Sequence, residues 1–228
     1  MKRSIAVAAA FIPAFCALCG AAPKPAPVPA KPAASVPPRK TAEQQTAQQL
    51  HDGALKDFTR GDLEAARAGF EKVLALAPEN PPALINLALI AQRQRRHSDA
   101  EQLLRRVLSR DFENGAAWLL LGIDAYEQNK LEAATAHLAQ AVLYAPKDAR
   151  ARQYLGVTFG KRHWYSAGED ELRSAVELNP KSADAHYNLA ALYMERVPPA
   201  VELARRHYTR AIELGAAADE KLAERIGK

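Results

Sequence analysis

The chain has 228 residues, a formal net charge of +5 and a sequence pI of about 9.2. This basic balance would suit a nucleic-acid partner, but six basic residues and no acidic residue fall within positions 1–40. Without those six, 25 of the chain's 31 Lys and Arg residues remain, against 26 acidic residues. The rest of the chain is therefore close to neutral, and we expect no nucleic-acid partner.

Positions 1–21 have the composition of an export signal. A Lys-Arg pair precedes a mostly apolar run from Ser4 to Leu18, and small residues follow. This run is shorter than the roughly 20 residues that a membrane-spanning helix needs. Cleavage after Ala21 leaves small residues one and three positions before the cut. We expect a signal peptide over 1–21 and an exported protein of the periplasm or cell envelope. A lipidated or retained N-terminus, the only expected contact with a membrane, is the alternative.

The segment between the leader and the rest of the chain predicts a linker. Residues 22–40 are rich in Pro, Ala and Lys, a composition that blocks helix and strand and favours an extended, disordered chain. It would serve either as a tether or as a simple spacer. Both cysteines, Cys16 and Cys19, fall in the leader, so the cleaved chain would have no thiol for a disulfide, a metal site or a nucleophile.

From Thr41 onward the sequence is rich in helix-forming residues and repeats itself at a fixed offset of about 34 residues, which we call the repeat length. Small residues recur at Ala66, Ala100 and Ala134. Large apolar residues recur at Phe70, Leu104, Leu138 and Leu172, and at Leu87, Leu121, Leu155 and Leu189. Proline recurs at Pro78, Pro146 and Pro180. Each unit closes with a short turn phrase: APEN, DFEN, APKD or NPKS. A regular array of helical units is predicted.

The stretch that begins at Trp118 resembles the tetratricopeptide repeat, whose pattern runs W-x2-L-G-x2-Y, then A-x3-F, then P. The matching residues are Trp118, Leu121, Gly122, Ala134, Leu138 and Pro146. The resemblance implies an all-α fold, a right-handed superhelix (α-solenoid) of about five helix-turn-helix units over residues 41–228. The expected units are 47–80, 81–114, 115–148, 149–182 and 183–216, with a capping helix over 217–228.

Close packing of two helices requires a small residue on one helix and a large one on the other. The expected notches of the first helices are Gly53, Ala88, Gly122, Gly156 and Ala190. The other structural positions of the repeat are Ala66, Phe70, Pro78, Ala100, Trp118, Leu121, Ala134, Pro146, Leu155, Pro180, Leu189, Ala204 and Tyr208.

Local signals predict the helix boundaries. Ser98 with Glu101, and Ser166 with Glu169, are typical of capping boxes that open second helices. The fifth unit carries extra residues within 195–202, which predicts a longer turn there, with one of its two prolines starting the next helix.

No pattern for catalysis, a metal or a cofactor is present. The six histidines lack metal-ligand spacing, and neither a phosphate-binding loop nor a nucleophile elbow occurs. The Arg-Gly-Asp triplet that starts at Arg60 suits a turn between helices rather than an adhesion motif. We therefore expect a protein that is not an enzyme, with no catalytic residues, no metal and no cofactor.

The resemblance implies that the first helices form a concave groove for a partner. The expected groove residues are His51, Leu55, Phe58, Ile85, Leu89, Arg93, Leu119, Ile123, Tyr126, Gln153, Val157, Lys161, Tyr187 and Met194. This mostly apolar lining suits a peptide. The leading hypothesis is a non-catalytic protein-protein interaction scaffold of the cell envelope that binds a peptide or protein in this groove.

Two basic clusters support a second hypothesis. They are Arg93, Arg95, Arg96, Arg105, Arg106 and Arg110, and then Lys147, Arg150, Arg152, Lys161 and Arg162. Such clusters would attract an anionic envelope polymer or an acidic partner. They would equally serve as solvated outer faces.

Overall fold

The computed structural model describes residues 42–227, so the expected signal peptide and linker lie outside the described residues. The described residues form helices and no strand. The helices are α1 (Ala42–Thr59), α2 (Leu63–Leu76), α3 (Pro81–Arg93), α4 (His97–Arg110), α5 (Gly115–Glu127), α6 (Leu131–Tyr144), α7 (Ala149–Lys161), α8 (Tyr165–Leu178), α9 (Ala183–Glu195), α10 (Val201–Glu213) and α11 (Glu220–Gly227). None of them combines the length and the apolar character that crossing a membrane requires.

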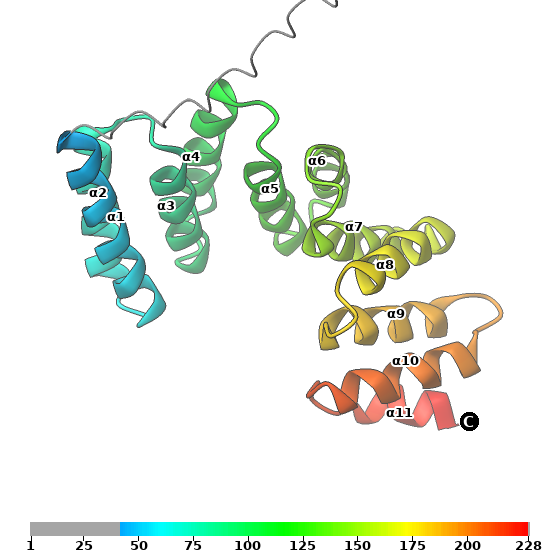
Figure 1. The fold of residues 1–228 in the computed structure, drawn as a ribbon. Coiled ribbons are helices and arrows are strands. Elements are labelled where there is room, and N and C mark those ends of the chain that lie inside the picture. The colour runs from blue at the N-terminus through cyan, green and yellow to red at the C-terminus, as the bar shows by residue number, and fades with distance from the viewer. Residues whose placement is uncertain (1–41, 228) are drawn as a thin grey trace, which may run out of the picture. The chain divides into compact units, whose positions relative to one another are not determined.

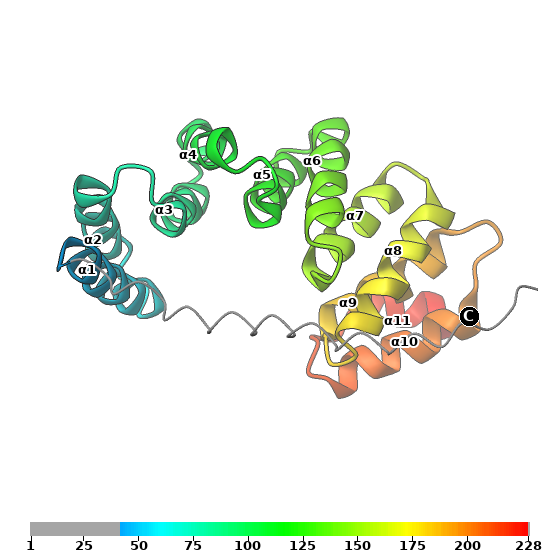
Figure 2. The same cartoon turned by 45° about the horizontal axis from the view of Figure 1, so that its top comes forward.

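The helices pack in the order in which they follow one another in the sequence. Each odd-numbered helix from α1 to α9 packs against the even-numbered helix after it, and each pair packs against the next pair (Figures 1 and 2). Further contacts join odd-numbered helices of neighbouring pairs, as between α5 and α7 and between α7 and α9. The structure thus confirms the predicted all-α class and the α-solenoid of helix-turn-helix units.

Polar side chains fix where the first helices of the units begin. The starts of α3, α5, α7 and α9 are separated by equal steps of one repeat length. The residue before each start is an N-cap whose side-chain oxygen accepts a hydrogen bond from a backbone amide in the first turn. These caps are Asn80, Asn114, Asp148 and Ser182, the last letters of the four turn phrases.

The second helices after α2 begin without a side-chain cap, and the two predicted capping boxes are wrong. Helix α4 begins at His97 and α8 at Tyr165, so Ser98 and Ser166 already lie inside the helices, and neither helix has a side-chain cap. A left-handed residue in the preceding turn reverses the chain instead. Such residues recur one repeat length apart at Gly61, Arg95, Asn129 and His163, with φ of 86°, 56°, 58° and 60°.

Small residues let the helices of a pair approach closely, as at Gly122. A Cβ atom built there would lie 2.5 Å from Cγ of Leu138, and one built at Gly156 would lie 2.7 Å from Cγ of Leu172. The expected notch at Gly53 is wrong by one residue, because a Cβ there would meet nothing within 4 Å. The residue that packs closely in α1 is Ala54, whose Cβ would lie 2.6 Å from a Cβ built on Gly69.

The remaining structural positions divide into three groups by exposure. The buried positions are Ala66, Phe70, Ala88, Ala100, Leu121, Ala134, Leu155, Leu189, Ala190 and Ala204. Trp118 and Tyr208 are half-buried, and the turn prolines Pro78, Pro146 and Pro180 are exposed at the ends of the units. The core is therefore a row of small and large apolar side chains between consecutive helices.

The fifth pair has a longer connection, and a short helix follows it. Helix α10 begins at Val201, and the two prolines before it belong to the turn. The expectation that one of these prolines starts the helix is therefore wrong. Helix α11 packs on α9 and α10 and buries Leu222 and Ile226. The side chain of Asp219 caps α11 by accepting a hydrogen bond from the amide of Leu222. The apolar end of the row is thus covered.

Candidate functional site

The predicted groove residues were expected to face a partner, and most of them reach the surface. Leu55, Arg93 and Lys161 are exposed. The half-buried residues are His51, Phe58, Ile85, Leu89, Tyr126, Gln153, Val157 and Tyr187. These side chains come from the odd-numbered helices, and we call the surface that they share the first-helix face.

Three of the predicted groove residues are buried, so their assignment to a partner-contacting surface is wrong. Leu119 and Ile123 are only 4% and 6% exposed, because they pack in the cluster that joins α5 to α7. Met194 is 6% exposed and packs with Leu222 and Ile226 of α11. The sequence pattern places these residues on the correct helices but does not reveal how the neighbouring helices cover them.

Cations of one unit cover aromatic rings of the unit before it. The guanidinium carbon of Arg93 lies 4.2 Å from the centre of the Phe58 ring. Nζ of Lys161 lies 4.0 Å from the centre of the Tyr126 ring. The two contacts are equivalent, since both members of the second pair stand two repeat lengths after those of the first. Such contacts hold a flexible cation in place over an aromatic face.

Two adjoining pockets lie between α5, α7 and α9. The first, which we call the apolar pocket, has a volume of about 300 Å³. It is lined by Val157, Gly160, Lys161, His163, Tyr165, Leu172, Asn188, Ala191, Leu192 and Glu195. The second, the tyrosine pocket, has a volume of about 170 Å³ and is lined by Tyr126, Gln153, Tyr154, Val157, Asp184, Tyr187 and Asn188. The shared residues Val157 and Asn188 join the two pockets.

A third pocket continues from the tyrosine pocket toward the C-terminal helix. This cap pocket has a volume of about 610 Å³ and is lined by Asp184, Tyr187 and residues 216–221. Asp184 and Tyr187 belong to both. The hydroxyl of Tyr187 donates a hydrogen bond of 2.6 Å to Asp219, which raises the pKa of Tyr187 to about 12 and lowers the pKa of Asp219. The three pockets therefore adjoin one another through shared lining residues and follow α9, and we call them together the groove beside α9.

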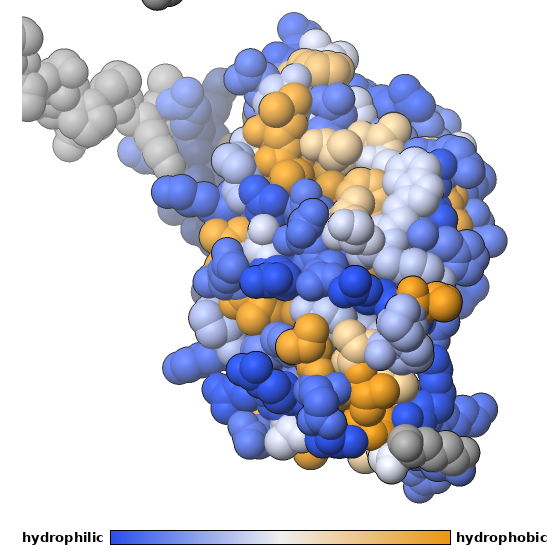
Figure 3. Space-filling model, turned by 90° about the vertical axis from the view of Figure 1, so that its right-hand side faces the viewer, coloured by the Kyte–Doolittle hydropathy of each residue, from blue (hydrophilic) through white to orange (hydrophobic). Residues whose placement is uncertain are grey.

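The surface around these C-terminal helices alternates in character. Figure 3 shows apolar patches separated by hydrophilic side chains on the side of the molecule that lies at the right of Figure 1. Large apolar side chains that remain exposed in this half of the chain include Trp164, Leu178 and Leu203. Trp164 is covered in part by Arg162, whose guanidinium carbon lies 3.9 Å from the centre of its ring.

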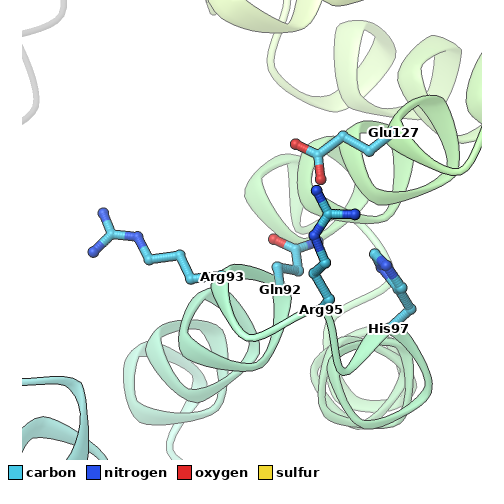
Figure 4. Close-up of a pocket in the computed structure, with 5 residues that line it drawn as sticks. All are labelled: Gln92, Arg93, Arg95, His97 and Glu127. Carbon is cyan, nitrogen blue, oxygen red and sulfur yellow. The ribbon is translucent and has the colours of Figure 1, made fainter.

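A fourth pocket lies nearer the N-terminus and is polar. It has a volume of about 420 Å³ and is lined by Gln92, Arg93, Arg95, His97 and Glu127 (Figure 4). In Figure 4 the Arg95 side chain extends toward Glu127, His97 lies beside it, and the guanidinium of Arg93 points away. We call it the polar pocket.

The side chains at the base of the polar pocket are held by a buried carboxylate. Asp124 is only 5% exposed, and its Oδ1 lies 2.7 Å from Nδ1 of His97. Gln128 donates to the other carboxylate oxygen at 2.6 Å. Gln92 donates to the backbone oxygen of Leu120 at 2.9 Å. The rings and amides around the pocket are therefore fixed by hydrogen bonds within the protein.

Six of the eleven residues in the predicted basic clusters lie in ion pairs with neighbouring carboxylates. Arg105 pairs with Glu101, and both Arg106 and Arg110 lie within 4.0 Å of Glu79. The remaining ion pairs are Arg96 with Asp99, Arg152 with Glu171, and Arg162 with Glu132. The exposed pairs among them contribute little to stability, but all of them reduce the charge that is free to attract a polyanion.

The sequence hypothesis did not include the polar pocket or the full lining of the other three. The sequence pattern places Arg95 only in a basic cluster, and it gives His97 no role beyond that of a histidine without metal-ligand spacing. The left-handed position recurs at every repeat length, but Gly61, Arg95, Asn129 and His163 share no side-chain type that would reveal it in the sequence. The Arg-Gly-Asp triplet lies at the α1–α2 turn, where Asp62 caps α2. Within residues 42–227, no three potential metal ligands come together.

The serial packing of helical pairs defines a helical repeat protein. Residues 57–122 and 91–156 each match the family model described as tetratricopeptide repeat. The chain is a tetratricopeptide-repeat protein. Proteins with this repeat generally act as scaffolds for interactions between proteins, and the fold of this chain supports that general role.

The comparisons with curated proteins cover parts of much longer chains. The chain is 26% identical over 143 residues to the BBSome complex member BBS4 homolog of Drosophila melanogaster, which is 61% of this chain and 29% of the relative. It is 30% identical over 87 residues to the cell division cycle protein 27 homolog of Caenorhabditis elegans, which is 38% of this chain and 11% of the relative. The chain thus spans less than a third of the length of either relative.

Solved structures resemble the fold over most of the chain. PilF of Pseudomonas aeruginosa superposes with a TM-score of 0.74 at 20% identity, covering 82% of this chain and 85% of PilF. YrrB, a tetratricopeptide-repeat protein with an unusual peptide-binding site, gives a TM-score of 0.58 at 21% identity, covering 81% of this chain and 96% of YrrB. At these identities the likeness concerns the fold alone.

Proposed function

We propose that the protein binds a peptide segment of another protein on the first-helix face, in the groove beside α9. The observation that supports this proposal is the continuity of three pockets. Val157 and Asn188 join the apolar pocket to the tyrosine pocket, and Asp184 and Tyr187 join the tyrosine pocket to the cap pocket. A continuous groove with apolar walls and a few polar groups is the usual form of a peptide site.

The chemistry of the groove suits a chain with alternating apolar and polar contacts. Leu172 and Leu192 lie at one end and would pack against an aliphatic or aromatic side chain of the partner. The amides of Gln153 and Asn188 each offer a donor and an acceptor to a peptide backbone. Tyr126, Tyr154 and Tyr187 provide large surfaces with little conformational freedom to lose.

Site-specific photo-crosslinking in intact cells tests the groove. A photoreactive amino acid at Gln153 or Asn188, which line the tyrosine pocket, should crosslink to one discrete partner, and the crosslinked peptides should map to one segment of it. The matched control position is Glu177, which is exposed on a second helix. Crosslinks of equal yield from Glu177, or crosslinks spread over many unrelated proteins, would contradict the proposed site.

A groove variant provides the second arm of this test. Tyr126→Ala removes a ring that lines the tyrosine pocket and supports Lys161, so we expect a clear loss of the crosslink from Asn188. Ile123→Asp is unsuitable as a test because Ile123 is buried and the charge would disrupt the core. Lys181→Ala, an exposed change before α9, should leave the crosslink unchanged.

We place the partner in the cell envelope. The support is the composition of residues 1–40, with a basic start, an apolar run and a Pro-rich segment. Mass spectrometry of the protein from cells should find a mature N-terminus that begins at residue 22, in the periplasmic or envelope fraction. An intact, unmodified N-terminus in the soluble cytoplasm would refute this placement.

The alternative, an electrostatic binder of an anionic polymer, has less support. Four of the six arginines of the first cluster pair with three carboxylates, Asp99, Glu101 and Glu79, so about half of the cluster's charge is already compensated. Retention of the protein on anionic phosphatidylglycerol vesicles should consequently be weak. Two results together would favour the alternative. The first is strong retention that is lost when the salt is raised from low to moderate concentration, and the second is an equal loss of retention in Arg105→Gln.

A further inference from the structure

The polar pocket and the apolar pocket occupy equivalent places two units apart. Every residue that lines the polar pocket has a counterpart two repeat lengths later that lines the apolar pocket. The pairs are Gln92 and Gly160, Arg93 and Lys161, Arg95 and His163, His97 and Tyr165, and Glu127 and Glu195. The first-helix face thus carries the same kind of opening twice.

At the other two boundaries between first helices, the equivalent places are covered by the chain's own side chains. At the α1–α3 boundary Arg93 covers Phe58, and at the α5–α7 boundary Lys161 covers Tyr126. The slot that holds Phe58 and Tyr126 in these units holds Gln92 and Gly160 in the others. Closed and open boundaries therefore alternate along the row, and the true period of the surface is two units.

The two openings differ in chemistry because of this one slot. Gly160 leaves the apolar pocket open down to Leu192, whose Cδ1 would lie 3.2 Å from a Cβ built on the glycine. Gln92 instead fills the equivalent space and bonds to the backbone of Leu120. In the polar pocket Gln92 and His97 are thus already bonded to Leu120 and Asp124, so Arg95 supplies the hydrogen-bond donors that face the opening, opposite the acceptor Glu127.

The turn residues at the two openings have a backbone that is unfavourable for them. Arg95 and His163 have φ of 56° and 60°, in the left-handed region that Gly and Asn tolerate best. Gly61 and Asn129 occupy the same position at the two closed boundaries. A large functional side chain thus stands in this position only where a pocket is open, which is the distribution expected of ligand contacts.

We propose that the two openings are paired anchor sites for one extended segment of a partner protein. An acidic side chain of that segment enters the polar pocket and is bound by the guanidinium of Arg95, and an aliphatic or aromatic side chain enters the apolar pocket. This inference rests on the proposed function and adds a second, polar anchor to it. First helices of adjacent units contact each other, and the axes of packed helices lie about 10 Å apart. Two units therefore correspond to roughly six residues of extended chain.

Selection from a peptide library tests the spacing. A random library of 12-residue peptides displayed on phage is selected against the full chain. The expected consensus contains an Asp or Glu and a large apolar residue about six positions apart. The best peptide is then synthesised with a fluorescent label, and its affinity is measured by fluorescence anisotropy.

Two variants address the two anchors separately. Arg95→Gly removes the donor while easing the backbone, so folding is preserved, and its matched control is Asn129→Gly at a closed boundary. Gly160→Gln fills the apolar pocket with the side chain found at position 92, and its control is Gly53→Gln on the open surface of α1. Each test variant should weaken the peptide about tenfold or more, and each control should have little effect.

The partner peptide supplies the decisive comparison. Replacing its acidic residue by Gln should weaken binding to the natural chain but not to Arg95→Gly, because the same contact is already lost there. If Gly160→Gln weakens binding and Arg95→Gly does not, the paired anchors are refuted while the groove stands. If neither variant matters, or if the library yields no binder, both the inference and the proposed function fail.

Discussion

At the scale of single residues, the fold depends on where small side chains stand. The repeat length identified most notch positions correctly because close packing restricts them to Gly and Ala. The notch of α1 was assigned to the wrong residue, because Gly53 and Ala54 are both small. Counting exactly one repeat length back from Ala88 gives Ala54, which is the residue that packs closely. Exposure was harder to predict, because Leu119 and Met194 are covered by helices whose positions a repeat pattern does not give.

Two glycines that look alike in sequence should respond oppositely to substitution. Gly122→Leu should destabilise the protein by about 1–3 kcal/mol, because the new side chain would overlap the buried Leu138. Gly53→Leu should stabilise it by about 0.5–1 kcal/mol, since the site is open and Gly is a poor helix former. Urea unfolding followed by circular dichroism measures both. Equal effects of the two changes would contradict the assigned packing.

The left-handed turn residues allow a second test at this scale. His163→Gly should stabilise the protein by up to about 1 kcal/mol, because Gly adopts φ near 60° without steric cost. Asn129→Gly should change stability less, since Asn tolerates this conformation. Thermal unfolding midpoints compare the two variants. A large loss of stability in His163→Gly would show that the bond between His163 and Tyr165 outweighs the backbone strain.

At the scale of helices, the boundaries depend on the turn before each first helix. The turn phrases were recognised in the sequence, and their last residues are the caps. The false capping boxes at Ser98 and Ser166 arose because a Ser three residues before a Glu also occurs inside a helix. Specific contacts between helices could not be predicted from the repeat pattern. One such contact is the histidine pair of α9 and α10, whose Nδ1 atoms lie 2.9 Å apart.

This histidine pair should make stability depend on pH. Burial and the neighbouring His186, with smaller effects of Arg206 and Arg173, lower the pKa of His207. The unfolded chain therefore binds more protons near the ordinary histidine pKa of about 6.5, and stability should fall as the pH drops through and below it. Burial also lowers the pKa of His137, which adds to the same trend.

A substitution separates the contribution of the pair. His207→Phe removes one proton-binding site but keeps a ring beside Tyr193, so its stability should fall less steeply between pH 7.5 and 5.5. His163→Gln, a change at an exposed histidine, is the control and should retain the full slope. Urea midpoints at several pH values supply the comparison. An unchanged slope in His207→Phe would assign the effect elsewhere.

At the scale of the whole row, each pair of helices contacts only its neighbours, so stability is local. The sequence predicted this solenoid because every unit repeats the same packing residues. The surface was only partly predictable. Its two-unit period depends on which side chains cover one another, and the residues at the equivalent slot, Phe58, Gln92, Tyr126 and Gly160, share no common chemistry.

A destabilising substitution in α11 should loosen the C-terminal helices before the rest of the solenoid. Leu222→Ala should cost about 2 kcal/mol or more, because the side chain is 5% exposed and packs in the cluster of α9, α10 and α11. Hydrogen exchange should accelerate first in α10 and α11, while amides of α3 to α6 keep their protection. Lys221→Ala, at an exposed position, is the control. Uniform acceleration along the chain would show cooperative unfolding instead.

The alternation of open and closed boundaries also limits how such a chain can lengthen. Duplication of a single unit would preserve the backbone fold, because the units share the same packing between their two helices and stack in series. It would nevertheless place two open or two closed boundaries side by side. Only duplication of two consecutive units reproduces both the helices and the order of the boundaries, so the smallest segment that carries the whole surface pattern is a pair of repeats.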